Sequence, residues 1–94
     1  MEVVHKKDKH LIEFGEGEDK ARLVYKFYKN SLAVLSTYVP KSERGKGIAA
    51  ALTKAVFTYA KEINKSVMMY CSYTSLYVNR HPELRKQLNT SFHS

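Results

Sequence analysis

The stretch PKSERGKGIAAALTKAV, residues 40–56, marks the point where a strand-like pattern gives way to a helical one. Two glycines lie one residue apart, flanked by cations and followed by an alanine-rich apolar run. Helix starts ordinarily favour Ser, Thr, Asp or Asn at the cap. Glycines there let the free N–H groups of the first turn approach an anion. The alternative is a strand-to-helix turn with glycines for tight packing and cations for solubility.

Upstream of this stretch the sequence alternates polar and apolar residues, which predicts half-buried strands. The strand-like segments are residues 1–5, 10–14, 21–28 and 32–39, separated by turns at residues 6–9, 15–20 and 29–31. Pro40 ends the last segment because proline cannot donate to a strand ladder. The first 40 residues therefore predict a four-stranded antiparallel meander.

Downstream of Gly47 apolar residues recur every three or four positions, which predicts an amphipathic helix that ends at Asn64 and Lys65. Residues 66–71, SVMMYC, read as a strand covered on both faces. A short helix follows and stops near Pro82. Residues 83–94 are compatible with either a closing helical turn or a loosely packed tail. The fold class is α+β, with the fifth strand parallel to the fourth, in a single domain over residues 1–94.

Charge and composition limit the classes of partner. The net charge is +7, and residues 41–94 hold nine basic and three acidic side chains. A polyanion is the natural partner for that half, although simple solubility is an equal alternative. No apolar run is long enough to span a membrane, and the first residues hold no signal-peptide core. The single Cys71 excludes an internal disulfide and fits a cytoplasmic location.

Two of the three glycine-loop patterns considered fit poorly. A P-loop requires Ser or Thr after a Gly-Lys pair, and none follows here. Residues 45–50, GKGIAA, do satisfy the dinucleotide pattern G-x-G-x-x-A. That pattern belongs to a first βαβ unit and requires an acidic residue at the end of the next strand. Here the next strand ends in Tyr70, Cys71 and Ser72, and four antiparallel strands come first.

The third pattern, [QR]-x-x-G-x-[GA], is met by residues 44–49, RGKGIA. With it the chain resembles the GNAT acetyltransferase superfamily, whose loop cradles the pyrophosphate of acetyl-CoA. Residues 71–83, CSYTSLYVNRHPE, resemble a segment of the minimal single-domain GNAT-like proteins. Together the matching segments span roughly residues 36–83. The resemblance implies acetyl-CoA as cofactor and an amine of unknown identity as acceptor.

The resemblance also implies a set of cofactor-binding residues. Main-chain groups of Thr37, Tyr38 and Val39 would meet the pantetheine arm, at a strand that splays from its neighbour. The acetyl-bearing end would lie near Ser72 and Tyr73. The pyrophosphate would lie against Arg44, Gly45, Lys46, Gly47, Ile48 and Ala49, with Lys41 as an approximate match for the 3′-phosphate.

Two catalytic routes remain open at Cys71. A lone cysteine is often only a small buried hydrophobe, but the resemblance implies that Cys71 is a candidate acyl acceptor in a two-step transfer. In the alternative route an amine attacks directly, and Tyr77 acts as the acid for the leaving group. Tyr77 could equally be a packing residue. His81 is interpreted as a surface residue, with a base or a turn residue as the alternatives.

Two other functional classes compete with the acetyltransferase. One is a non-catalytic acetyl-CoA-binding module, favoured by the absence of an obvious carboxylate base. The other is a nucleic-acid binder, disfavoured because the basic residues are not interleaved with aromatics in a known RNA-binding motif. Larger superfamily members have helices between the first two strands, where this chain has only KKDK, so the acceptor side is expected to be open or completed by a partner. The acceptor and the oligomeric state are not predicted.

Overall fold

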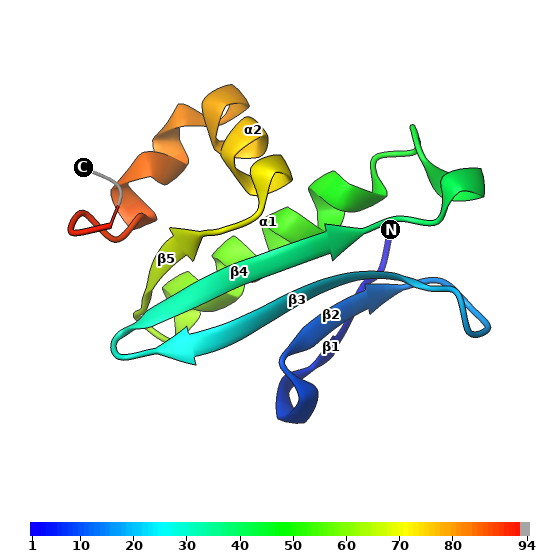
Figure 1. Ribbon diagram of the computed structural model, residues 1–94, viewed down its shortest axis with the longest axis horizontal. Helices are drawn as coiled ribbons and strands as arrows, with labels where there is room; N and C mark the ends of the chain where they lie inside the picture. Colours follow the sequence, from blue (N-terminus) through cyan, green and yellow to red (C-terminus); the bar gives the residue numbers. More distant parts are fainter. Residues whose placement is uncertain (93–94) are drawn as a thin grey trace.

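A computed structural model describes residues 1–92 as one mixed sheet with two α-helices (Figure 1). This confirms the predicted α+β class. Residues 93–94, the end of the segment for which a helical turn or a tail was considered, lie outside the described residues. The strands are β1 (Val4–Lys6), β2 (Leu11–Phe14), β3 (Ala21–Tyr28), β4 (Ser31–Tyr38) and β5 (Ser66–Met69); the helices are α1 (Ile48–Glu62) and α2 (Ser72–Arg80); the 3-10 turns are η1 (Lys7–Lys9), η2 (Lys41–Glu43) and η3 (Pro82–Gln87).

The sheet has the strand order β1-β2-β3-β4-β5. The first four strands are antiparallel to their neighbours, and β5 runs parallel to β4. Both features agree with the predicted meander and crossover. In Figure 1 α1 lies behind β3 and β4, while α2 and η3 lie beyond β5. Helix α1 thus covers one face of the sheet and connects its two parallel strands.

The core forms between the apolar stripe of α1 and the facing side of the sheet. Leu52 and Val56 of α1 are fully buried, as are Leu23 of β3 and Val34 of β4. These positions follow the three-and-four spacing of the helix and the alternation of the strands. Burial of such side chains removes apolar surface from water, which is the main source of stability for a domain of this size.

Strand β4 contains a bulge that the sequence pattern did not predict. Val24 pairs with Ser36, but the next residue of β3, Tyr25, pairs with Val34, so Leu35 has no opposite residue. A bulge bends its strand and increases the local twist. The parallel pairing with β5 also ends at Val34, whose carbonyl accepts a last bond from the Tyr70 N–H at 3.0 Å. Strand β5 consequently ends at Met69, two residues earlier than expected.

The segment after η3 is packed against the sheet. Leu88 is buried and forms a parallel bridge with Val67 of β5, and the Asn89 N–H donates to the Val67 carbonyl at 2.9 Å. The Asn89 side-chain amide donates to Ser31 Oγ at 2.7 Å. Of the two alternatives for this segment, the closing helical turn is observed for residues 82–87, and the residues directly after it extend the sheet edge.

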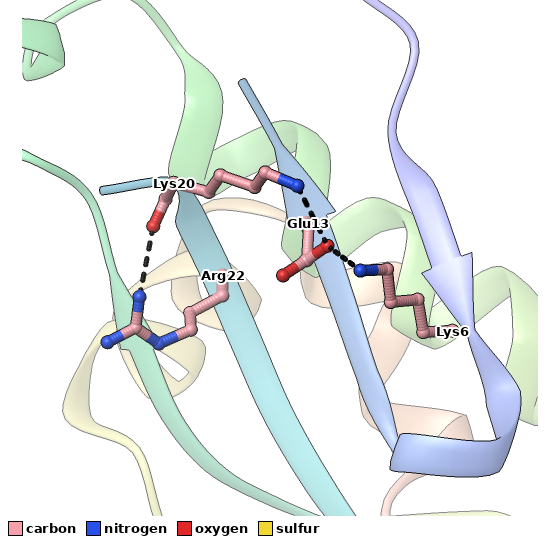
Figure 2. A network of polar contacts seen from close by, with 4 residues as sticks. All are labelled: Lys6, Glu13, Lys20 and Arg22. Atoms are coloured by element: carbon pink, nitrogen blue, oxygen red, sulfur yellow. Dashed lines mark hydrogen bonds and ion pairs between the residues drawn. The ribbon is translucent and has the colours of Figure 1, made fainter. Parts of the chain in front are cut away.

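At the opposite edge an ion-pair network joins the first three strands (Figure 2). Lys6 Nζ of β1 lies 2.9 Å from Glu13 Oε1 of β2, and Lys20 Nζ lies 3.8 Å from the same oxygen. Arg22 donates to the Lys20 carbonyl at 3.2 Å. The hydrogen bond with Lys6 lowers the pKa of Glu13 below its ordinary value, and this effect outweighs the opposing effect of burial. The carboxylate therefore favours the folded state in its charged form.

Candidate functional site

A cavity of about 460 Å³ opens where β4 and β5 stop pairing, between the end of β4 and the start of α1. Past Val34 the β5 side of β4 lacks a neighbouring strand. Eleven residues line the cavity: Thr37, Tyr38, Val39, Glu43, Arg44, Gly45, Gly47, Ile48, Ala49, Ala50 and Tyr73. Nine of them are among the cofactor-binding residues that the resemblance implies.

The end of β4 contributes backbone to this cavity. Thr37 and Tyr38 remain paired with β3 on one side and have no partner strand on the other. The Tyr38 hydroxyl donates to Asp19 Oδ1 at 2.9 Å, and the Arg22 guanidinium lies 4.9 Å from the centre of the Tyr38 ring. These contacts hold the ring at the loop before β3. The main-chain groups of Thr37 and Tyr38 on the β5 side therefore have no strand partner and remain available to a bound molecule.

The two glycines adopt the left-handed backbone conformation, with φ of 83° at Gly45 and 81° at Gly47. A Cβ at either position would meet no heavy atom within 4 Å beyond its chain neighbours. Tight packing, the alternative interpretation of these glycines, therefore does not explain why glycine is needed. The left-handed backbone conformation explains it, and the space where a side chain would lie is open.

Helix α1 begins at this loop without a side-chain cap. Gly47 occupies the N-cap position and no side chain accepts a hydrogen bond from the first turn. The N–H groups of residues 48–50 therefore have no acceptor in their own helix, and Ala49 and Ala50 both line the cavity. Free amides together with the positive end of the helix dipole favour a bound anion such as a phosphate.

The charged side chains of the loop are arranged differently from expectation. Arg44 Nε donates to the Val39 carbonyl at 3.1 Å, which links the loop to the end of β4. Lys46 Nζ lies 3.2 Å from Glu43 Oε2. Lys41 and Lys46 are exposed and do not line the cavity, whereas Glu43 does. Sequence reasoning missed Glu43 and Ala50; the only signal was their position within or directly after the glycine loop.

Cys71 is half-buried at the N-cap of α2, next to the cavity wall. Its Sγ lies 3.6 Å from the side-chain oxygen of Thr37. Burial raises the pKa of the Cys71 thiol, but hydrogen bonds from Thr37 and from the backbone of Thr74 and Tyr73 together outweigh it, so the pKa lies below its ordinary value. The Thr37 side chain was not foreseen as a partner of Cys71, because only its main chain was considered.

The remaining predicted residues lie along α2. Tyr73 lines the cavity, but Ser72 and Tyr77 do not. Tyr77 is buried, and burial raises its pKa, with Tyr73 and Glu83 adding to the shift. Its phenol therefore stays protonated at neutral pH. Its ring centre lies 6.4 Å from that of Tyr73 and 4.1 Å from that of His81.

His81 is not the surface residue that was expected. It is half-buried and stacks on Tyr77, and its Nδ1–H donates to the Tyr77 carbonyl at 2.9 Å. The interaction closes the C-terminal turn of α2 directly before Pro82. A simple surface interpretation from sequence could not anticipate a stacking partner four residues earlier on the same helix face.

Among residues 1–92, no three His, Cys, Asp or Glu side chains are grouped so that they could hold a metal ion. Within the same residues no helix combines the length and apolar character needed to cross a membrane.

Comparison with known proteins supports the resemblance. Residues 9–88 match the family model described as GCN5-related N-acetyl-transferase, so the chain belongs to this family. Its fold is similar to the solution structure of a GCN5-like protein from Staphylococcus aureus, with a TM-score of 0.75 and 22% identity over 94% of this chain and 87% of that one. No curated protein matches the chain. The family and the fold support acetyltransferase activity, and members of this family generally use acetyl-CoA as the acetyl donor.

Proposed function

We propose that this chain is a single-domain N-acetyltransferase that binds acetyl-CoA and acetylates an amine. One observation carries the proposal: the uncapped N-terminus of α1, behind two left-handed glycines, lines the same cavity as the end of β4, which has no partner strand on its β5 side. That combination offers an anion site and a strand-like row of backbone groups side by side. Membership of the GCN5-related family makes acetyl-CoA the ligand to expect there.

The chain's residues fit the two ends of such a ligand. The amides of residues 45–50 would receive the pyrophosphate, and the backbone of residues 37–39 would pair with the amides of the pantetheine arm. The negative charge of Glu43 is offset by Lys46, which lies 3.2 Å away. Arg44 contributes positive charge at the loop while its Nε holds Val39 in place.

In the chemistry we propose, Cys71 is the acyl acceptor. Acetyl-CoA supplies an acetyl group activated as a thioester. The Cys71 thiolate is favoured by hydrogen bonds from Thr37 and the first turn of α2. As the nucleophile it attacks the thioester carbonyl, the bond to the CoA sulfur breaks, and CoA leaves as a thiolate that takes up a proton from solvent. The acceptor amine then attacks acetylated Cys71, the bond between the acetyl carbon and Sγ breaks, Cys71 regains its thiolate, and the amine releases a proton to solvent. Tyr77, the candidate acid for direct transfer, lines a neighbouring cavity together with His81, so it has less support for that role.

A binding module without turnover is the second candidate. Among residues 1–92 the hydrogen-bond partners of Cys71 are Thr37, Tyr73 and Thr74, none of them a carboxylate or histidine, so the acceptor amine lacks an evident general base. On this alternative the chain holds acetyl-CoA in the same cavity, and Cys71 remains a free thiol. The two candidates share the binding site and differ only in whether acetyl-CoA is consumed.

An amide NMR titration with acetyl-CoA, followed by intact mass spectrometry, tests the proposal. Shifts confined to the amides of residues 37–39 and 44–50, together with an acetyl adduct on wild type but not on Cys71→Ala, are the expected result. Shifts without an adduct would favour the binding module or direct transfer. No shifts with acetyl-CoA in excess would overturn the cofactor assignment.

A further inference from the structure

A second concave surface has Tyr77 in its wall and shares no lining residue with the cofactor cavity. Two cavities, of about 510 and 380 Å³, share Lys61 and Gln87 in their walls and form adjoining parts of one groove. The groove runs between α1 and η3. We call it the lysine groove, after four of its lining residues: Lys54, Lys61, Lys65 and Lys86.

The lysines of this groove are not neutralised within the described residues. Glu83 is the only carboxylate in its walls, and the ion pairs among residues 1–92 all lie elsewhere. Lys61 lies in the last turn of α1, where the helix dipole already favours a cation. That explanation does not extend to Lys54, in the middle of the helix, or to Lys86 on η3.

Gln87 adds an unmet acceptor to the same groove. Its Oε1 is buried and has no hydrogen-bond partner among the described residues. A buried acceptor left unpaired destabilises the protein, so a ligand that brings a donor is favoured. Phosphate groups bring mainly acceptors, whereas a peptide brings N–H donors along its backbone. A peptide rich in Asp and Glu matches both the lysines and the Gln87 oxygen.

We propose that the lysine groove binds an acidic peptide segment of a partner protein. The charge of the segment is complementary to the lysines. Gln87 is half-buried in the groove wall, and once its side chain turns toward the segment a backbone N–H of the segment donates to Oε1. Tyr77 lines the lysine groove while Tyr73 lines the cofactor cavity, so the two sites are separate. The proposal does not depend on acetyl transfer.

Fluorescence anisotropy with a labelled peptide of alternating Glu and Gly, at low ionic strength, tests the charge complementarity. The variant Lys61→Glu/Lys86→Glu is expected to bind about tenfold more weakly, because like charges then face the peptide. The control Lys9→Glu/Lys26→Glu makes the same change in net charge at exposed positions on η1 and β3, and should bind within about twofold of wild type. Glu83→Gln should bind more tightly.

Equal losses in the two double variants, or no binding by wild type, would overturn the proposal. So would displacement of the peptide by saturating acetyl-CoA, which would place it in the cofactor cavity. The variant Gln87→Met preserves the shape of the side chain and removes the acceptor. It should therefore weaken peptide binding and leave tripolyphosphate binding unchanged. If peptide binding is unchanged in Gln87→Met, or if a single-stranded oligonucleotide binds the lysines more tightly than the peptide, the peptide assignment fails. Thermal melts confirm that each variant is folded.

Discussion

Gly47 and Gly17 have nearly the same left-handed backbone, with φ of 81° and 78°, and open space where a Cβ would lie. Alanine at either site should therefore cost about 1 kcal/mol of stability, measurable by urea unfolding. Gly47 lines the cofactor cavity, whereas Gly17 lies in the loop between β2 and β3. The Gly47→Ala variant is expected to lose about tenfold in acetyl-CoA affinity by calorimetry, because its Cβ occupies space beside the first-turn amides.

Gly17→Ala is the matched control, since it has the same backbone strain and lies away from the cavity. Its acetyl-CoA affinity should equal that of wild type. A parallel loss of affinity in both variants would show that the effect arises from general destabilisation, and equal affinity in all three proteins would remove the glycine loop from the cofactor site.

The contact of Thr37 with Cys71 gives a second prediction for a single residue. The Thr37 hydroxyl, 3.6 Å from Sγ, donates to the thiolate once the cysteine is deprotonated. Thr37→Val removes this donor, so the pKa of Cys71 should rise and alkylation by iodoacetamide at neutral pH should slow. Thr37→Ser should keep the wild-type rate, and so should Thr58→Val, the same change at an exposed position of α1. An unchanged pH profile in Thr37→Val would contradict this role.

At the scale of elements, the sequence predicted which segments become strands and helices but not how β4 ends. The period-two pattern of residues 21–28 and the three-and-four spacing after Gly47 reflect burial on one face. Burial follows the strand pattern except at the end of β3, where Phe27 is exposed. The bulge at Leu35 produces no such pattern in the sequence, because an exposed leucine is compatible with a regular strand position. The cavity lies past Val34, where β4 is no longer paired with β5. Thus the glycine loop could be predicted from sequence, whereas Glu43 and the Thr37 hydroxyl could not.

The pairing of β1 with β2 offers a test at the same scale. Lys6 and Glu13 form an ion pair of 2.9 Å whose side chains are 36% and 14% exposed. A double-mutant cycle with Lys6→Met and Glu13→Gln should give a coupling of about 0.5 kcal/mol, which shrinks as salt is added. Folding lowers the pKa of Glu13. The stabilisation that its carboxylate contributes is therefore complete above the ordinary pKa of 4.5 and is lost as the pH falls further. No coupling in low salt would contradict the pairing.

The molecule as a whole separates its two proposed binding surfaces along α1. The N-terminus of the helix faces the cofactor cavity, and its C-terminal half lines the lysine groove. Both surfaces favour anions, in keeping with the net charge of +7. The cofactor cavity does so with backbone amides and a helix dipole, whereas the lysine groove does so with side-chain ammonium groups. Salt should therefore weaken peptide binding more steeply than acetyl-CoA binding.

A partly buried aromatic cluster makes the stability of the domain depend on pH. His5 of β1 contacts Tyr59 of α1, with ring centres 4.3 Å apart, and its Nε2 lies 2.7 Å from the Tyr25 hydroxyl of β3. Burial, together with the neighbouring Tyr59, raises the pKa of Tyr25 to about 12, so its hydroxyl stays protonated and hydrogen-bonds with Nε2 of the neutral imidazole. The cluster therefore joins the first strand, the sheet and the helix through an uncharged imidazole.

Burial lowers the pKa of His5 below its ordinary 6.5, and Lys7 lowers it further against the opposing effect of Glu62. The unfolded chain therefore binds this proton more readily than the folded one. The stabilisation is complete above pH 6.5 and is lost as the pH falls through the folded pKa, with a slope of at most about 1.4 kcal/mol per pH unit. Urea unfolding between pH 8 and pH 5 should show this loss in wild type and a flatter profile in His5→Gln, which cannot titrate. Parallel profiles would mean that His5 has the same pKa in the folded and unfolded protein, and would contradict the prediction.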